Sequence, residues 1–89
     1  MKALIYVRGK DAIQQIGECE EYAAANGLEV ISVAKNESEF TAFVLSGKID
    51  CVLVLHASRI TRSKKEYEKT EDMLRSFGVE IIAAGGELL

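Results

Sequence analysis

The sequence predicts a small three-layer α/β/α domain built on a four-stranded parallel sheet. Four short runs of apolar and β-branched residues recur along the 89-residue chain, amphipathic segments separate them, and the chain contains no proline. The runs cover residues 3–7, 28–34, 51–56 and 79–84. Because crossovers between parallel strands are right-handed, three crossovers place helices on both faces of the sheet, and we expect strand order 2-1-3-4.

Each run is nearly continuous in apolar residues, which is typical of strands covered on both faces. The first helix is expected between Asp11, as its N-terminal cap, and the stop signal at Gly27. Its spacing predicts an inward face and a solvated face. The inward set is Ile13, Ile16, Tyr22 and Ala23, and the solvated set is Gln14, Gln15, Glu18, Glu20 and Glu21.

The second and third helices are also bounded by polar caps and glycines. Behind Ser38, three apolar residues at helical spacing predict about two and a half turns that end at Gly47. The third helix opens with a capping-box pattern from Ser63 to Glu66 and ends at Gly78. Its predicted apolar stripe is Tyr67, Thr70, Met73, Leu74 and Phe77.

Composition indicates one ordinary globular domain over residues 1–89. The chain is 48% hydrophobic and 28% charged, with a net charge of −3 and a pI of about 5.1. Such a balance argues against coating nucleic acid through bulk charge, so any anion site must be local. Cys19 and Cys51 lack the spacing of a zinc site and are expected as buried thiols. We expect no metal, no cofactor and no membrane segment, and a cytoplasmic location.

Three arginines follow the first and third predicted strands. Arg8 closes the first, and Arg59 and Arg62 follow the third. Neighbouring strands whose crossovers leave to opposite faces form a crevice at their carboxyl ends, so we expect these side chains to meet there. Guanidinium groups bind phosphate through paired, charge-assisted hydrogen bonds. The alternative is that carboxylates neutralise them, with Arg8 paired to Asp11 or Asp50 and Arg62 paired to Glu66.

At these residues the chain resembles the catalytic domain of the serine recombinases, the resolvase and invertase family. The resemblance rests on three segments: Tyr6-Val7-Arg8 with Gln14 downstream, Gly47-Lys48-Ile49-Asp50 leading into Cys51-Val52-Leu53-Val54, and Arg59-Ile60-Thr61-Arg62-Ser63. It implies a resolvase-like fold over nearly the whole chain and a role in DNA strand exchange. It also implies that Arg8, Arg59 and Arg62 surround a scissile phosphate and that Gln14 lies nearby.

The sequence departs from the family pattern at the position of the nucleophilic serine, which is Lys10 here. An acidic position before the second arginine motif is Ser58, and the segment between the second strand and helix is shortened to residues 35–38. We expect neither the long oligomerisation helix nor the DNA-binding domain of the family. The resemblance therefore implies a catalytically inactive relative with no catalytic residue. Its expected basic phosphate and DNA-backbone cleft is formed by Arg8, Lys10, Gln14, Arg59 and Arg62.

Two other functions stay open. The chain could be an interaction or regulatory module that pairs with itself or with an active recombinase, through an uncovered sheet edge or helix face. It could also be an enzyme on a small phosphorylated substrate, with His56 as a proton shuttle. A lone histidine is more often structural than catalytic.

Overall fold

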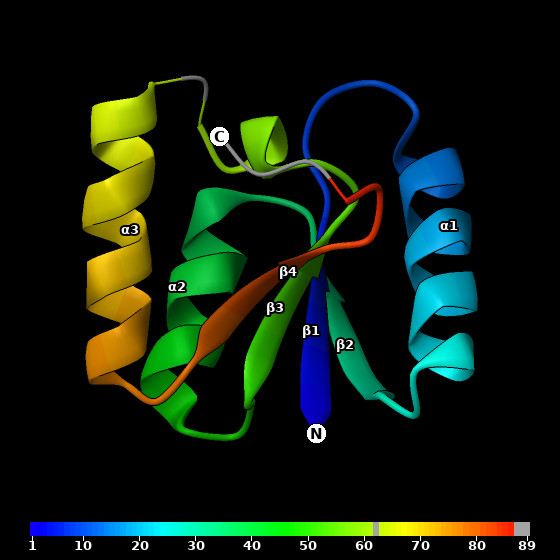
Figure 1. Ribbon diagram of the computed structural model, residues 1–89, viewed down its shortest axis with the longest axis horizontal. Coiled ribbons are helices and arrows are strands. Elements are labelled where there is room, and N and C mark those ends of the chain that lie inside the picture. The colour runs from blue at the N-terminus through cyan, green and yellow to red at the C-terminus, as the bar shows by residue number, and fades with distance from the viewer. Residues whose placement is uncertain (62, 87–89) are drawn as a thin grey trace.

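The computed structural model describes residues 1–61 and 63–86 and contains one parallel sheet (Figure 1). Its strands are β1 (Lys2–Tyr6), β2 (Glu29–Ala34), β3 (Cys51–Val54) and β4 (Glu80–Ala83). The strand order is β2-β1-β3-β4, and all neighbouring strands are parallel, as predicted. In the centre of the sheet, Ile5 lies opposite Val33 on one side and Leu53 on the other.

Helices cover both faces of the sheet. Helix α1 (Ala12–Ala25) lies on one face, and α2 (Glu37–Ser46) and α3 (Lys64–Ser76) lie on the other (Figure 1). A short 3-10 helix, η1 (Ala57–Arg59), follows β3. Because side chains alternate along a strand, β1 contributes to two hydrophobic cores. Ile5 packs on the α1 side, whereas Leu4 and Tyr6 pack on the α2 and α3 side.

The prediction of strands covered on both faces is confirmed for the two central strands and holds in part for the outer two. All residues of β3 and four of the five residues of β1 are buried. Most residues of β2 and β4 are half-buried, because these strands are the edges of the sheet and the helices cover them incompletely. Their side chains still pack into both cores, with Ile31 and Ile81 on one face and Val33 and Ile82 on the other.

Helix α1 departs from the predicted inward face only in its first turn. The side chain of Ile13 is 89% exposed, whereas Gln15 is 1% exposed and lies on the inward face. The other members of the predicted inward set pack against the core, as expected: Ile16, Tyr22 and Ala23. Asp11 takes the N-cap position, but its backbone is left-handed with φ 65° and its side chain makes no capping hydrogen bond. The burial of Gln15 has a physical cause, since its amide satisfies backbone groups of the preceding loop.

The other two helices begin with side-chain caps. Asn36, and not Ser38, caps α2, with Oδ1 accepting from the Glu39 amide at 2.9 Å. Ser63 caps α3 as predicted, with Oγ accepting from the Glu66 amide at 3.3 Å. All three helices are followed by a glycine with positive φ, Gly27, Gly47 or Gly78, which confirms the predicted stop signals.

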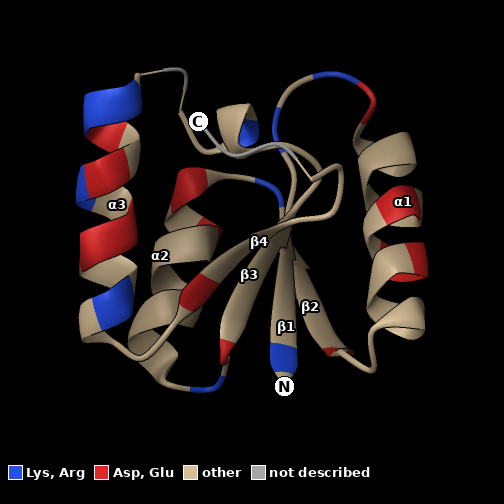
Figure 2. Ribbon diagram, in the orientation of Figure 1, with Lys and Arg blue, Asp and Glu red and all other residues tan. Residues whose placement is uncertain are grey.

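The predicted apolar stripe of α3 is buried only in part. Tyr67 and Leu74 are buried in the core, but Met73 is 42% exposed and Phe77 is 48% exposed. The acidic residues of α1 that are predicted to be solvated, Glu18, Glu20 and Glu21, are exposed. Glu68 and Asp72 of α3 are exposed as well, and Figure 2 shows acidic residues along both helices.

Cys19 and Cys51 are buried free thiols, as predicted. Burial raises the pKa of both thiols to about 11, and neighbouring carboxylates act in the same direction. Among the described helices, none combines the length and the apolar character that a membrane crossing needs.

Candidate functional site

The carboxyl ends of β1 and β3 lie side by side and carry the candidate site. Between the loop after β1 and the η1 segment lies a cavity of about 410 Å³. It is lined by Arg8, Gly9, Ser58, Arg59, Ile60 and Thr61. Figure 2 shows basic residues in both segments at this end of the sheet. The structure thus brings together two of the three predicted arginines, and Arg62 lies outside the described residues.

Arg8 and Arg59 link the two segments by reciprocal hydrogen bonds. Nη1 of Arg59 donates to the carbonyl of Arg8, and Nη1 of Arg8 donates to the carbonyl of Ile60, each at 3.4 Å. These are long, weak bonds, and each occupies one of the five N–H groups of a guanidinium. Nε of Arg59 is buried and has no hydrogen-bond partner among the described residues. Both arginines therefore keep donors available for a ligand.

Gln15 holds the loop that carries Arg8. Its Oε1 accepts from the Arg8 amide at 3.3 Å, and its Nε2 donates to the carbonyls of Arg8 and Lys10, at 2.9 Å each. These bonds are partly buried, so the side chain of Gln15 replaces water as the partner of the loop backbone. Sequence reasoning missed Gln15, although its spacing of four and eight residues from Cys19 and Ala23 places all three on one helix face.

Two residues with positive φ turn the chain from β1 into α1. Gly9 has φ 79° and Asp11 has φ 65°, in the left-handed region that glycine adopts readily and aspartate tolerates. A Cβ at Gly9 would lie 3.6 Å from Nη1 of Arg59, which is an ordinary contact. The backbone conformation, and not lack of space, therefore favours glycine at this position.

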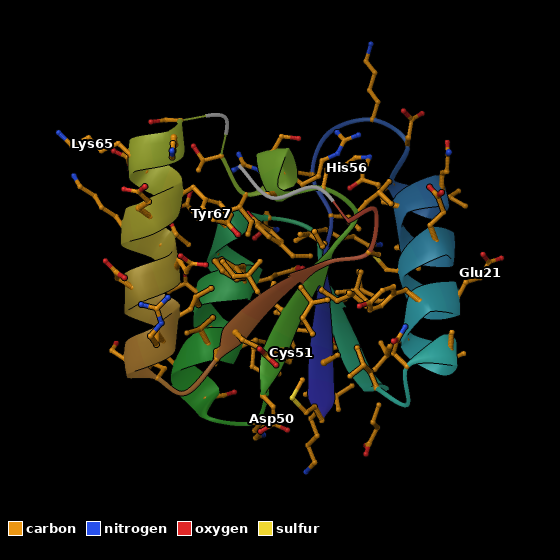
Figure 3. All side chains as sticks on the ribbon, in the orientation of Figure 1. Glu21, Asp50, Cys51, His56, Lys65 and Tyr67 are labelled. Carbon is orange, nitrogen blue, oxygen red and sulfur yellow. The ribbon has the colours of Figure 1, made fainter. Side chains whose placement is uncertain are left out.

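The carboxylates proposed as partners of Arg8 lie elsewhere or make no ion pair with it. Asp50 is at the amino end of β3, at the opposite edge of the sheet from His56 (Figure 3), and its Oδ2 accepts from the Lys2 amide at 2.7 Å. In the described part of the chain, ion pairs are found only between Arg75 and two acidic residues of its own helix. Neither Arg8 nor Arg59 is neutralised within residues 1–61 and 63–86. A pair between Arg62 and Glu66 lies outside the described residues.

The remaining predicted site residues do not line this cavity. Lys10 contributes its carbonyl to the bond with Gln15, and its side chain is exposed. Gln14 is exposed and its Nε2 donates to Glu18 at 3.5 Å, along the helix surface. His56 packs against Gly85, where a Cβ would lie 2.6 Å from the imidazole ring. The polar side chain next to Arg8 is therefore that of Gln15, and not that of Gln14.

A second cavity of about 230 Å³ adjoins the first and shares Arg8, Ile60 and Thr61 with it. One side is the stacked pair of Tyr6 and Phe40, whose ring centroids are 4.5 Å apart. Its other lining residues are Glu37, Glu66 and Thr70. Burial raises the pKa of the Tyr6 hydroxyl, against the opposing charge of Arg8 and with a smaller addition from Glu37. Positive and negative side chains thus both act on this cavity.

Comparison with solved structures identifies the fold. The catalytic domain of ISC1926 TnpA, an IS607-like serine recombinase, superimposes with a TM-score of 0.83 and 27% identity, over 94% of this chain and 70% of that chain. The N-terminal catalytic domain of TP901-1 integrase gives 0.85 and 22%, over 96% and 78%. A resolvase family site-specific recombinase from Streptococcus pneumoniae gives 0.81 and 19%, over 96% and 72%.

The sequence alone matches no family model, and no curated protein matches it. The three-dimensional likeness nevertheless extends over nearly the entire chain. The protein has the fold of a serine recombinase catalytic domain, and the resemblance found in its sequence is confirmed.

Proposed function

We propose that this domain binds the phosphodiester backbone of DNA at the Arg8 and Arg59 cavity without cleaving it. One observation carries the proposal: two guanidinium groups line a single cavity, and no described carboxylate lies within ion-pair distance of either. Phosphate contacts of this kind supply affinity without reading sequence. Two of the proteins that share the fold are recombinases and a third is an integrase, which makes DNA the first ligand to test.

The absence of cleavage rests on Lys10, which takes the place of the family's nucleophilic serine. A lysine side chain is protonated at neutral pH and has no hydroxyl with which to form a phosphoserine ester. Two hydroxyls do line the cavity, on Ser58 and Thr61. Thr61 Oγ1 accepts from the Ser63 amide at 3.3 Å, and the described residues that line the cavity include no histidine and no carboxylate to act as a base.

Binding is tested by fluorescence anisotropy of a short labelled duplex at low and moderate salt. Arg59→Gln should weaken binding several-fold, whereas Arg75→Gln, which removes the same charge from the far end of α3, should leave it nearly unchanged. The affinity of the native protein should fall as salt rises. Equal losses in both variants would show that only the overall charge matters and would overturn the proposal.

Cleavage is tested separately by denaturing electrophoresis of the protein mixed with supercoiled and short duplex DNA. We expect no protein–DNA adduct and no nick. An adduct that maps to Ser58, Thr61 or Lys10 would show that the domain is an active enzyme.

Pairing with another protein is the second candidate, and the β4 edge favours it. Glu80–Ala83 has no strand beyond it in the described sheet, and Ile81 and Ile82 are half-buried. Edge strands of this kind pair with other chains unless charge or cover prevents it. Sedimentation equilibrium should detect a dimer that Ile81→Lys abolishes, and a monomer at every concentration would remove self-pairing from consideration.

A further inference from the structure

The two adjoining cavities share Arg8, Ile60 and Thr61 and make up two chemically different halves of one surface region. The half at Arg8 and Arg59 favours anions. The other half is bounded by the stacked Tyr6 and Phe40 rings and by Glu37. A ligand bound in one half therefore lies next to the other, with the Arg8 side chain at the boundary. The two larger hollows lie near the amino ends of the strands, and each combines the Asp50 carboxylate with basic residues, Arg75 in one and Lys2 and Lys48 in the other.

Glu37 is not used to cap its own helix. The α2 cap is made by Asn36, whose Oδ1 accepts from the Glu39 amide, and by Glu39, whose Oε1 accepts from the Lys35 amide, both at 2.9 Å. The Glu37 carboxylate makes no hydrogen bond and no ion pair with any described residue, although it lines the cavity. Because Asn36 and Glu39 cap the helix, the Glu37 carboxylate keeps its acceptor oxygens for a ligand.

Glu66 lines the same cavity, and its carboxylate does not accept the hydrogen bond that a complete capping box would give it. The Ser63 amide, which a capping-box glutamate would accept, donates to Thr61 Oγ1 at 3.3 Å instead. Arg62 lies outside the described residues, so Glu37 is the principal acceptor of this cavity, and Glu66 is a second acceptor among its lining residues.

The two halves therefore select opposite groups. Arg8 and Arg59 take a phosphate, and the carboxylate of Glu37 takes a hydrogen-bond donor. A carbonyl oxygen in the second half would meet a negative acceptor and be disfavoured. The second cavity is small, about 230 Å³, which suits one planar ring better than a drug-sized ligand.

We propose that the second cavity is a nucleobase subsite that favours a base with an exocyclic amine, such as cytosine, over a base with a carbonyl at that position, such as uracil. The inference rests on the proposed phosphate site, because the phosphate of the same nucleotide lies at Arg8 and Arg59. It deepens that function by adding base preference to a backbone contact that by itself reads no sequence.

The test compares three ligands by calorimetry on the native chain at low salt: inorganic phosphate, dCMP and dUMP. The two nucleotides differ at ring position 4, which carries an amine in cytosine and a carbonyl in uracil, and at the adjoining N3, which is an acceptor in cytosine and carries a hydrogen in uracil. A charged hydrogen bond gained by one and a repulsion suffered by the other predict that dCMP binds roughly tenfold more tightly than dUMP. Glu37→Gln should reduce this ratio to near one, because an amide accepts and donates.

Glu21→Gln is the matched control. Glu21 lies on α1, on the other side of the sheet (Figure 3), so the variant removes the same charge and should keep the tenfold ratio. The ligand comparison uses the unchanged protein, so the inference stays testable if Glu37→Gln does not fold.

Each outcome is decisive. Equal affinity for dCMP and dUMP, with phosphate bound, overturns the nucleobase subsite and leaves the phosphate site standing. No binding of phosphate or of either nucleotide overturns the proposed function and the inference together. A preference for dCMP that Glu37→Gln retains contradicts the role of Glu37 and with it the inference. Repeating the comparison with single-stranded dC and dU oligonucleotides distinguishes a base within a strand, which keeps the preference, from a free nucleotide.

Discussion

The side chain of Gln15 binds the backbone of Arg8 from both sides, accepting from its amide at 3.3 Å and donating to its carbonyl at 2.9 Å. This pair fixes the direction in which the chain leaves β1. Arg59 also donates to the Arg8 carbonyl. This one carbonyl therefore links Gln15 of α1 to Arg59 of the η1 segment.

Removing the Gln15 amide should destabilise the protein. Gln15→Leu keeps a similar side-chain volume but removes the partner of the Arg8 amide and of the Lys10 carbonyl, and it leaves the Arg8 carbonyl with only the long bond from Arg59. The loss should cost about 1–3 kcal/mol of unfolding free energy. The exposed Gln14→Leu should change it by less than about 0.5 kcal/mol. Urea unfolding measures both. Equal effects would show that the three hydrogen bonds contribute little.

The left-handed backbone at Asp11 predicts a stabilising substitution. Asp11 makes no capping hydrogen bond, so Asp11→Gly loses no cap and relieves the positive φ, and it should raise the unfolding free energy or leave it unchanged. Asp11→Ala has a Cβ and lacks the polar tolerance of aspartate, and it should cost about 1 kcal/mol. Thermal unfolding compares the two, and a more stable alanine variant would argue against a left-handed Asp11.

Two glycines predict opposite effects of the same substitution. At Gly85 a new Cβ would lie 2.8 Å from the Leu55 carbonyl and 2.6 Å from the His56 ring, so Gly85→Ala should destabilise the end of the β3 and β4 pair. At Gly17, inside α1, nothing lies within 4 Å, and Gly17→Ala should stabilise by up to about 1 kcal/mol. Urea unfolding of both variants gives the comparison, and a harmless Gly85→Ala would contradict the packing of His56.

The buried thiols predict a loss of stability at high pH. In the folded protein burial raises the pKa of Cys19 and Cys51 from 9.0 to about 11, so the folded state favours the neutral thiol. That contribution is complete below pH 9 and decreases as pH rises from 9 to 11. Unfolding free energy should therefore fall over this range, and less so in a Cys19→Ala, Cys51→Ala variant. An identical fall in both proteins would assign the effect to other groups.

The architecture could be predicted because its signals are local and repeated. Alternating apolar runs and amphipathic segments gave the strand order, and glycines marked the helix ends. The convergence of Arg8 and Arg59 follows from the same topology, since the ends of neighbouring parallel strands must meet. A correct prediction of the fold therefore also predicts that Arg8 and Arg59 lie close together.

Features that depend on a particular partner could not be predicted. Gln15 is polar and was expected in solvent, but its partners are backbone groups that no periodicity reveals. The apolar side chain of Ile13 predicts an inward position, but the first turn of α1 places Gln15 inward and leaves Ile13 exposed. The sequence carries no signal for Glu37. Asn36 and Glu39 make the capping hydrogen bonds of α2, and only the structure shows that the Glu37 carboxylate is not needed for them.

The most direct test of the phosphate site is an NMR titration of the arginine side-chain N–H signals with inorganic phosphate. The account predicts saturable shifts at Arg8 and Arg59 that weaken with added salt, while Arg75 stays unchanged because acidic residues of its own helix already pair with it. If Arg8 and Arg59 do not respond while the protein remains folded, or if Arg75 shifts equally, the two guanidinium groups do not form a phosphate site.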